Sequence, residues 1–363
     1  MTDDDRQRAA ETPAESGAGE PAPAADPAPA PAAADEPVID LANPGALPPG
    51  EPPAPGKAKK QKRGGNWLDD LKAIIWLLLA VLVFHSCVAK PFYIPSESMM
   101  PGLLKGDRLV VSKYPYGWSW VSPSFHIFPH WEGRIWGAMP RRGDIVIVTP
   151  PNSSSDYIKR VIGLPGDTIQ VVDGQVVLNG QPLRRERRPD AMIPIDENIT
   201  CKTDYGAPAA RQFVWRVTRN GRDYCRMRVF REYIPDGNEL RAYDTIDAVD
   251  HARGPDEAPS VDDWPHELQN GRPYYTVPAG HVFLMGDNRD DSADSRVPLE
   301  GMGLGGGVPW ENIGGRAEFI TFSLDGSSSY WNPVSWFTAL RGGRAGTSLH
   351  PESVPAAQGG ASR

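Results

Sequence analysis

The longest apolar stretch of the chain runs from Ala73 to Phe84 and continues to Ala89, giving 17 consecutive positions without a formal charge. At about 1.5 Å per residue, such a helix reaches the lower end of what crosses a bilayer core of about 30 Å. Five cations precede it within residues 57–63, and cationic flanks stay on the cytoplasmic side. The pattern predicts an uncleaved transmembrane anchor at 67–90, with the N-terminus inside and everything after Lys90 exported.

Two other interpretations of the apolar stretch are open. A cleaved secretory signal has a short charged region before its apolar part, whereas about 72 residues precede this stretch. A buried core helix seldom runs this long without a charge.

The two ends of the chain have the composition of disordered segments. Residues 1–56 are dominated by Ala, Pro, Gly, Asp and Glu and hold no aromatic residue, so they cannot bury enough apolar surface to offset the entropy of ordering. We expect a disordered cytoplasmic tail over 1–66 and a second disordered tail over 342–363, after an aromatic segment at 326–341. The formal net charge of −8 argues against a nucleic-acid partner.

The exported part, about 91–340, reads as a succession of strands with little helical periodicity after the anchor. Asp-Gly and Asn-Gly pairs separate several apolar runs, as in hairpins with tight turns. The sequence predicts a mainly β protein with antiparallel sheets. The expected strands lie within residues 106–113, 143–149, 156–163, 168–172, 175–178, 213–218, 224–230, 281–285 and 313–322.

Ser98 lies between Ile94-Pro95 and Met99-Met100-Pro101, where regular structure is interrupted, and a lone serine is most often a surface hydroxyl unless a base activates it. Such a serine needs a base within hydrogen-bond reach. Of the seven histidines, only His281 lies near a motif-like block. Strand alternation offers another base, since Lys159 shares a face with Tyr157 and Val161, and apolar surroundings lower the pKa of an ammonium group. The alternative is that Lys159 ends a strand edge and faces solvent.

Four blocks of sequence resemble those of bacterial type I signal peptidases (leader peptidases), in the same order. They are I-P-S-E-S-M-M-P at 94–101, G-D-R-L-V-V-S-K at 106–113, R-G-D-I-V-I-V at 142–148 with Y-I-K-R-V-I-G-L-P-G-D at 157–167, and G-D-N-R-D-D-S-A-D-S-R at 286–296. Together they organise most of residues 91–325.

The resemblance implies a serine endopeptidase with Ser98 as nucleophile and Lys159 as general base. It implies that the Ser96 hydroxyl and the Ser98 N–H stabilise the oxyanion, as two fixed donors aimed at the developing charge would. It also implies that Ser292 orients the Lys159 amine by a hydrogen bond.

Four charged residues are expected to form ion pairs beside the site. Asp294 and Arg296, two positions apart on an extended segment, match a structural ion pair of the family, and Asp287 with Arg160 is a second expected pair. The alternative for Ser292 and these four residues is ordinary loop and ion-pair chemistry, in which they hold geometry and take no part in proton transfer.

The implied substrates are signal peptides of exported preproteins, cut after a small-X-small motif. Shallow pockets formed by Ile94, Tyr157 or Val146 would exclude larger side chains, and the substrate would pair in extended form with a strand edge. We expect a catalytic domain at 91–175 and 275–325, interrupted by a second β-rich domain at 176–274. The resemblance also implies a monomer that is anchored in the inner (cytoplasmic) membrane. Its catalytic domain would lie on the periplasmic or extracytoplasmic side, close to the bilayer, and we expect contact with the secretion machinery.

Several features depart from the family pattern. Glu97 places a carboxylate next to Ser98 where glycine is common, so its side chain must point away from the oxyanion, and Gly102 replaces a common threonine. Relatives often have two spans, whereas one is visible here. The insert at 117–141 carries four tryptophans, which suit either a bilayer interface or an aromatic minicore. Trp331 and Trp336 raise the same question.

The cysteines and the absence of other motifs complete the set of expectations. Cys201 and Cys225 are candidates for a disulfide in an oxidising compartment, although their spacing alone leaves the bond open. No Cys-x-x-Cys, histidine cluster or acidic pair suggests a metal, and no glycine-rich loop precedes a helix, so we expect no cofactor.

Three other functions remain open. One is an envelope hydrolase that uses Ser98 with His281 and Asp287, and another is a self-cleaving Ser/Lys repressor, which would need a DNA-binding module. The third is an envelope scaffold with a degenerate site.

Overall fold

The computed structural model describes residues 67–123, 129, 131–151, 153, 155–205, 212–250, 267–269 and 272–355. Several predictions lie outside these residues: the tail at 1–66 with its basic stop, and the last part of the C-terminal tail, 356–363. His126, His130, His251 and His266 also lie outside them. The described residues belong to one compact unit, 65–363.

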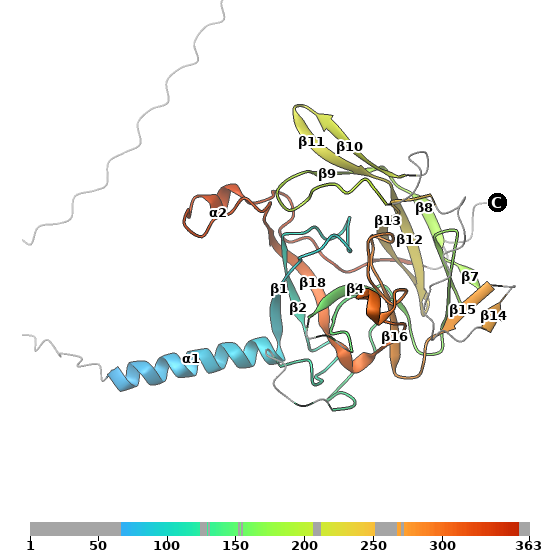
Figure 1. Ribbon diagram of the computed structural model, residues 1–363. Coiled ribbons are helices and arrows are strands. Elements are labelled where there is room, and N and C mark those ends of the chain that lie inside the picture. The colour runs from blue at the N-terminus through green and yellow to red at the C-terminus, as the bar shows by residue number, and fades with distance from the viewer. Residues whose placement is uncertain are drawn as a thin grey trace, which may run out of the picture. The chain divides into compact units, whose positions relative to one another are not determined.

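Helix α1 (Trp67–Cys87) covers most of the predicted anchor and leads almost directly into strand β1 (Ala89–Tyr93) (Figure 1). None of its side chains is buried, and its leucines, isoleucines and valines are exposed. Trp118 Nε1 donates a hydrogen bond to the carbonyl oxygen of Cys87 at the end of the helix, 2.8 Å away. No helix among the described residues is both long enough and apolar enough to cross a membrane.

A seven-stranded antiparallel sheet has the order β1-β2-β18-β3-β4-β16-β17, and the family-like blocks at 106–113 and 142–167 supply its strands β2, β3 and β4, whereas those at 94–101 and 286–296 lie in loops. Its inner strands β3 and β4 are buried almost throughout, which explains why β3 is apolar without alternation, whereas β4 carries Lys159 and Arg160 among its buried residues. The strands after β1 are β2 (Asp107–Ser112), β3 (Ile145–Val148), β4 (Tyr157–Gly163), β16 (His281–Met285), β17 (Val308–Pro309) and β18 (Ile313–Ser323). The prediction of a mainly β, antiparallel protein is confirmed.

Three smaller antiparallel sheets have the orders β14-β15-β5-β6-β7, β19-β13-β12-β8 and β10-β11-β9. The first two hold β5 (Thr168–Val172), β6 (Gln175–Leu178), β7 (Gln181–Pro182), β8 (Arg184–Arg187), β12 (Val229–Asp236), β13 (Glu239–Ile246), β14 (Glu267–Gln269), β15 (Arg272–Thr276) and β19 (Glu352–Pro355). The third holds β9 (Ala191–Pro194), β10 (Val214–Arg219) and β11 (Arg222–Met227).

The Asp-Gly and Asn-Gly pairs form the hairpin turns that the sequence predicts. Asp173-Gly174 joins β5 to β6 and Asn220-Gly221 joins β10 to β11, and all four residues have positive φ, as type I′ turns require. Among the described residues, the remaining elements are the short helix α2 (Ser335–Thr338) and two single 3₁₀ turns, Leu299–Gly301 and Trp310–Asn312.

The predicted boundary between the two domains does not separate two units in the structure. Residues 176–274 lie in the same compact unit as the rest, and a cut at 175 would fall inside the β5–β6 hairpin. One core cluster joins Ile162 and Phe283 of the large sheet to Ile234 and Tyr243 of the predicted insert. The two parts therefore share a hydrophobic core.

The segment 342–355, predicted as part of a disordered tail, is structured. Its β19 pairs with β13, and Leu349 packs in the core cluster that contains Ile94 and Met99. Composition alone misses this order because the segment contributes few apolar residues, while its backbone pairs with a strand that lies far away in the sequence.

Candidate active site

Ser98 lies on a loop closed at its base by backbone hydrogen bonds, which we call the serine loop (residues 94–107). The Ile94 N–H donates to the carbonyl oxygen of Asp107, 2.9 Å away, and the Gly106 N–H donates to that of Ile94, 3.0 Å away. Met99 and Met100 are fully buried and fix the loop in the core, so that Ser98 itself is 6% exposed.

Lys159 projects from the inner strand β4 and contacts Ser98. Its Nζ lies 3.0 Å from Ser98 Oγ, and the residue is 4% exposed. Burial lowers the pKa of Lys159 to about 8; Asp294 opposes this effect and Arg296 reinforces it. The structure thus brings together the predicted nucleophile and base, and a sizeable fraction of Lys159 is neutral near pH 7–8.

The two other predicted serines lie around this pair. Ser96 Oγ is 3.3 Å from Ser98 Oγ. Ser292 lines the same cavity as Lys159, but its buried hydroxyl makes no hydrogen bond to any described residue, including Lys159. The orienting hydrogen bond expected from Ser292 is therefore absent from this structure.

A cavity of about 680 Å³ opens over Ser98 and Lys159. Its walls come from residues 92–98, at the end of β1, from residues 155–159, at the start of β4, and from the loop after β16. Ile94 and Tyr157 line it, as predicted, but Val146 does not. Val146, the cross-strand partner of Lys159 on the inner strand β3, is fully buried in a cluster with Val161.

The predicted ion pairs are formed, and all of their members are buried except Arg296, which is partly exposed. Arg296 Nε and Nη2 each donate to the Asp294 carboxylate at 3.0 Å. Arg160 Nε and Nη2 bind the two oxygens of Asp287 at 2.6 Å. Burial raises the pKa of Asp294, but Arg296 and the Gly286 N–H outweigh that effect and hold it below its usual value.

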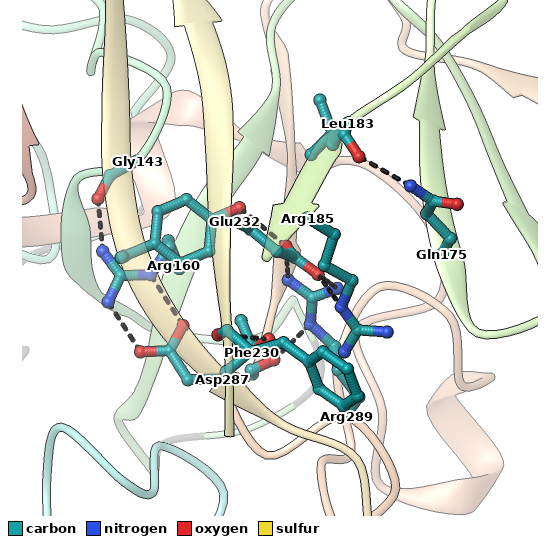
Figure 2. A network of polar contacts seen from close by, with 12 residues as sticks. Gly143, Arg160, Gln175, Leu183, Arg185, Phe230, Glu232, Asp287 and Arg289 are labelled. Carbon is teal, nitrogen blue, oxygen red and sulfur yellow. Dashed lines mark hydrogen bonds and ion pairs between the residues drawn. The ribbon is translucent and has the colours of Figure 1, made fainter. Parts of the chain in front are cut away.

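A buried network of charges lies behind the site and ties it to the predicted insert (Figure 2). Glu232 of β12 receives a bidentate pair of hydrogen bonds from Arg289, and the Arg289 Nε donates to the carbonyl oxygen of Gly286, 3.1 Å away. Arg185 of β8 lies within 3.5 Å of the same carboxylate. Buried charges destabilise a fold unless they are paired, so these pairs hold the 286–296 segment in one place.

Two positions that the sequence analysis did not single out hold Ser98. The Asn288 N–H donates to the carbonyl oxygen of Ser98, 3.0 Å away, and its side-chain amide donates to that of Glu97. Gly286 packs so tightly that a Cβ there would lie 2.6 Å from the Ser98 carbonyl oxygen and closer still to Ser292 Oγ. Both residues belong to the family-like block G-D-N-R, and this membership is the sequence feature that could have pointed to them.

The histidine alternative finds no support in the geometry. His281 Nδ1 lies 2.9 Å from the carbonyl oxygen of Ala279, and Asp287 is bound to Arg160. Neither His281 nor Asp287 lines the cavity that contains Ser98. The structure therefore does not assemble a Ser/His/Asp arrangement.

Cys201 and Cys225 are bonded, with Cα atoms 5.3 Å apart. Both pack in a core cluster with Met100 and Leu104 of the serine loop.

Glu97, next to Ser98, is half-buried and lines the cavity. Burial raises the pKa of its carboxyl group, and the nearby charge of Asp291 raises it further. A carboxyl group with a raised pKa carries less negative charge beside Ser98 as the pH falls.

Known protein families include one that matches most of this chain. The family model described as "Signal peptidase, peptidase S26" matches residues 67–322. The chain belongs to this signal peptidase family. The resemblance inferred from the four blocks is thereby confirmed.

Individual signal peptidases show the extent of the similarity. The signal peptidase I of Rickettsia prowazekii (strain Madrid E) is 34% identical over 250 residues, covering 68% of this chain and 77% of that protein. The signal peptidase I of Rickettsia typhi (strain ATCC VR-144 / Wilmington) is 33% identical over 256 residues, covering 70% and 80%. The crystal structure of a signal peptidase I from Enterococcus faecalis V583 matches 49% of this chain and 97% of its own, with 24% identity and a TM-score of 0.23, too low to compare the folds.

Proposed function

We propose that the protein is a signal peptidase I that removes N-terminal signal peptides from exported preproteins, with Ser98 as nucleophile and Lys159 as general base. The observation that carries the proposal is the contact of 3.0 Å between a buried lysine amine and a serine hydroxyl on a cavity wall. Family membership and the signal peptidase I relatives support the substrate class.

The chemistry follows from the neutral amine. Ser98 transfers its hydroxyl proton to Lys159 Nζ while Oγ attacks the scissile carbonyl carbon. Ser96 Oγ and the Ser98 N–H are the proposed donors to the oxyanion. The Lys159 ammonium then protonates the departing amine, which leaves an acyl-enzyme. Water hydrolyses this ester with Lys159 again accepting a proton.

We assign the preference for small side chains before the cut to the walls of the cavity. Ile94 and Tyr157 line it together with Ile147 and Ile158, and these side chains restrict the space next to Ser98. A preprotein segment would lie extended between the end of β1 and the start of β4. A small-X-small motif fits there because alternate side chains of an extended peptide point the same way.

Attachment to the membrane is part of the same proposal. The apolar side chains of α1 are exposed, as are Tyr330 and Trp331 around α2, at 93% and 96%. Exposed apolar patches mark membrane or protein contacts, and indoles favour the bilayer interface. In the insert, Trp136 is 85% exposed and stacks edge-on against Trp118. We propose that α1 and the 326–341 segment contact the bilayer.

The finer topology, a single pass with the N-terminus in the cytoplasm, stays a prediction, as do the monomeric state and contact with the secretion machinery. Protease treatment of spheroplasts, before and after lysis, tests the topology. An exported domain is digested in unlysed spheroplasts, whereas a cytoplasmic domain is digested only after lysis.

The function is tested with the full-length protein in detergent and a preprotein that carries Ala-X-Ala before its cleavage site. We expect cleavage after that motif, loss of cleavage in Ser98→Ala and Lys159→Met, and retention in His281→Ala. Loss in His281→Ala with retention in Lys159→Met would favour the histidine hydrolase. No cleavage by the unmodified protein would favour the scaffold.

A further inference from the structure

The serine loop is held from one side by a segment that lies beyond the part of the chain matched by the family model. That match ends at residue 322, whereas residues 341–349, which we call the strap, run from the end of the aromatic segment to β19. The strap contacts the serine loop at Asp107, at its base, and at the carbonyl groups of Gly102 and Lys105. We propose that Arg344 of the strap is a positioning residue for Ser98, an inference that rests on the proposed function.

Arg344 makes three contacts with the serine loop. Its Nε donates to Asp107 Oδ1, 2.9 Å away, and its Nη2 donates both to Asp107 Oδ2 and to the carbonyl oxygen of Gly102, 2.9 Å away. Asp107 is fully buried, and Arg344 is its ion-pair partner. One guanidinium therefore joins the base of the loop to the turn four residues after Ser98.

Two other strap residues, Arg341 and Leu349, also contact the serine loop. Arg341 Nη1 donates to the carbonyl oxygen of Lys105, 2.8 Å away, and its guanidinium is held by Asp196. Leu349 packs with Met99 and the other buried residues of the loop. These contacts anchor the strap itself and place Arg344 against the loop.

The opposite side of the loop is held at the serine itself, where Asn288 binds the carbonyl oxygens of Glu97 and Ser98. The loop is thus fixed between two supports. Without Arg344, the turn at Gly102 and the buried Asp107 carboxylate lose donors, and the segment from Met99 to Leu104 gains freedom to move. A displacement of about 1 Å at a reacting atom can reduce the rate about 100-fold.

The chain offers a matched control at a second turn of the same kind. Asp107 ends Leu104-Lys-Gly-Asp and Asp167 ends Leu164-Pro-Gly-Asp. Each aspartate accepts a hydrogen bond from the N–H of its leucine, at 2.8 and 2.7 Å. Arg142 grips Asp167 with two hydrogen bonds of 2.9 and 2.7 Å, and its side chain is 18% exposed against 20% for Arg344.

The second turn carries no contact with Ser98, so Arg142→Gln removes a comparable ion pair without freeing the nucleophile. The experiment compares full-length Arg344→Gln, Arg344→Lys and Arg142→Gln with the unmodified protein and Ser98→Ala. Measured quantities are kcat and KM for a preprotein, the thermal midpoint, and amide hydrogen exchange of residues 99–104.

We expect Arg344→Gln to lower kcat about 10- to 100-fold with KM changed less than about 3-fold. The thermal midpoint should fall about as much as in Arg142→Gln, while faster exchange at 99–104 should occur only in the Arg344 variants. Arg344→Lys keeps the charge beside Asp107 but cannot make all three contacts, so it should recover part of kcat. It also serves as the test if Arg344→Gln does not fold.

Equal kcat values in the Arg344 and Arg142 variants would overturn the positioning role. The same conclusion follows if Arg344→Lys is fully active without faster exchange at 99–104. These outcomes differ from failure of the proposed function, which would appear as undiminished cleavage by Ser98→Ala.

Discussion

Replacing Lys159 by methionine should abolish cleavage and yet stabilise the fold at neutral pH. Lys159 is a buried amine whose pKa falls from 10.5 to about 8 because burial disfavours its charged form. A tenfold change in proton affinity corresponds to about 1.4 kcal/mol, so the charged amine costs about 3 kcal/mol in the folded protein. Methionine has a similar shape and carries no charge, which removes that cost.

The sign of the pH dependence follows from proton binding. Below about pH 8 both the folded and the unfolded protein hold the proton on Lys159, and the full cost applies. Between pH 8 and 10.5 the unfolded state binds more protons than the folded state, so the stability of the unmodified protein rises with pH. The advantage of Lys159→Met should therefore be largest at pH 7 and nearly vanish by pH 10.5.

The lost contact with Ser98 Oγ reduces the gain, so we expect about 1–3 kcal/mol at pH 7. For a unit of this size, that corresponds to a rise in the thermal midpoint of about 2–6 °C. Calorimetry at pH 7 and pH 10 measures both values on the full-length protein in detergent. A Lys159→Met variant that is less stable at pH 7, or equally shifted at both pH values, refutes the reasoning.

Lys113 supplies the control for activity. Burial, followed by Lys90, lowers its pKa to about 8 as well, and its Nζ donates to the carbonyl oxygen of Ser122, outside the cavity. Lys113→Met should keep cleavage within about 3-fold of the unmodified protein. Loss of cleavage in both variants would mean that removal of a buried amine disturbs the fold, and that Lys159 has no special role.

Three further predictions concern the same site. Because only neutral Lys159 accepts a proton, kcat/KM should rise about tenfold per pH unit below its pKa of about 8 and level off above it; a flat profile from pH 6 to 9 would contradict the assignment. Ser292→Ala should keep kcat within about 3-fold and the thermal midpoint within about 2 °C, because the Ser292 hydroxyl makes no hydrogen bond to Lys159 or to any other described residue; a tenfold loss of kcat would contradict this and show that Ser292 orients the amine during the reaction. Gly286→Ala should reduce cleavage more than about 100-fold, since its Cβ would collide with Ser292 and the Ser98 carbonyl, whereas Gly342→Ala, with nothing within 4 Å, should be neutral; equal activity of the two variants would argue against tight packing at Gly286.

The strands and turns were predictable because they depend on neighbouring residues. Asp173-Gly174 and Asn220-Gly221 favour positive φ by themselves, and the buried run of β3 contains no polar residue that could face water. The segment 342–355 was mispredicted because its order comes from pairing with β13, about 110 residues earlier in the chain. The domain boundary at 175 failed for a similar reason, since the shared core is built from side chains far apart in sequence.

The candidate site was likewise only partly predictable from the sequence. Strand alternation places Lys159 on one face with Tyr157, and the family resemblance named Ser98 and Lys159 as partners, but neither gives the burial that lowers the lysine pKa. The missing hydrogen bond of Ser292, the fully buried Val146 and the role of Asn288 depend on side-chain positions set by packing.

The sequence by itself determined the class of fold, the turns, and the residue types that the chemistry requires, because backbone preferences and polarity act over a few residues. Only the tertiary structure decided that the amine of Lys159 is buried and lies 3.0 Å from Ser98, and that Arg344 contacts the serine loop from 246 positions further along the chain (344 minus 98). These properties arise where distant segments exclude water from a charged group and supply its partners.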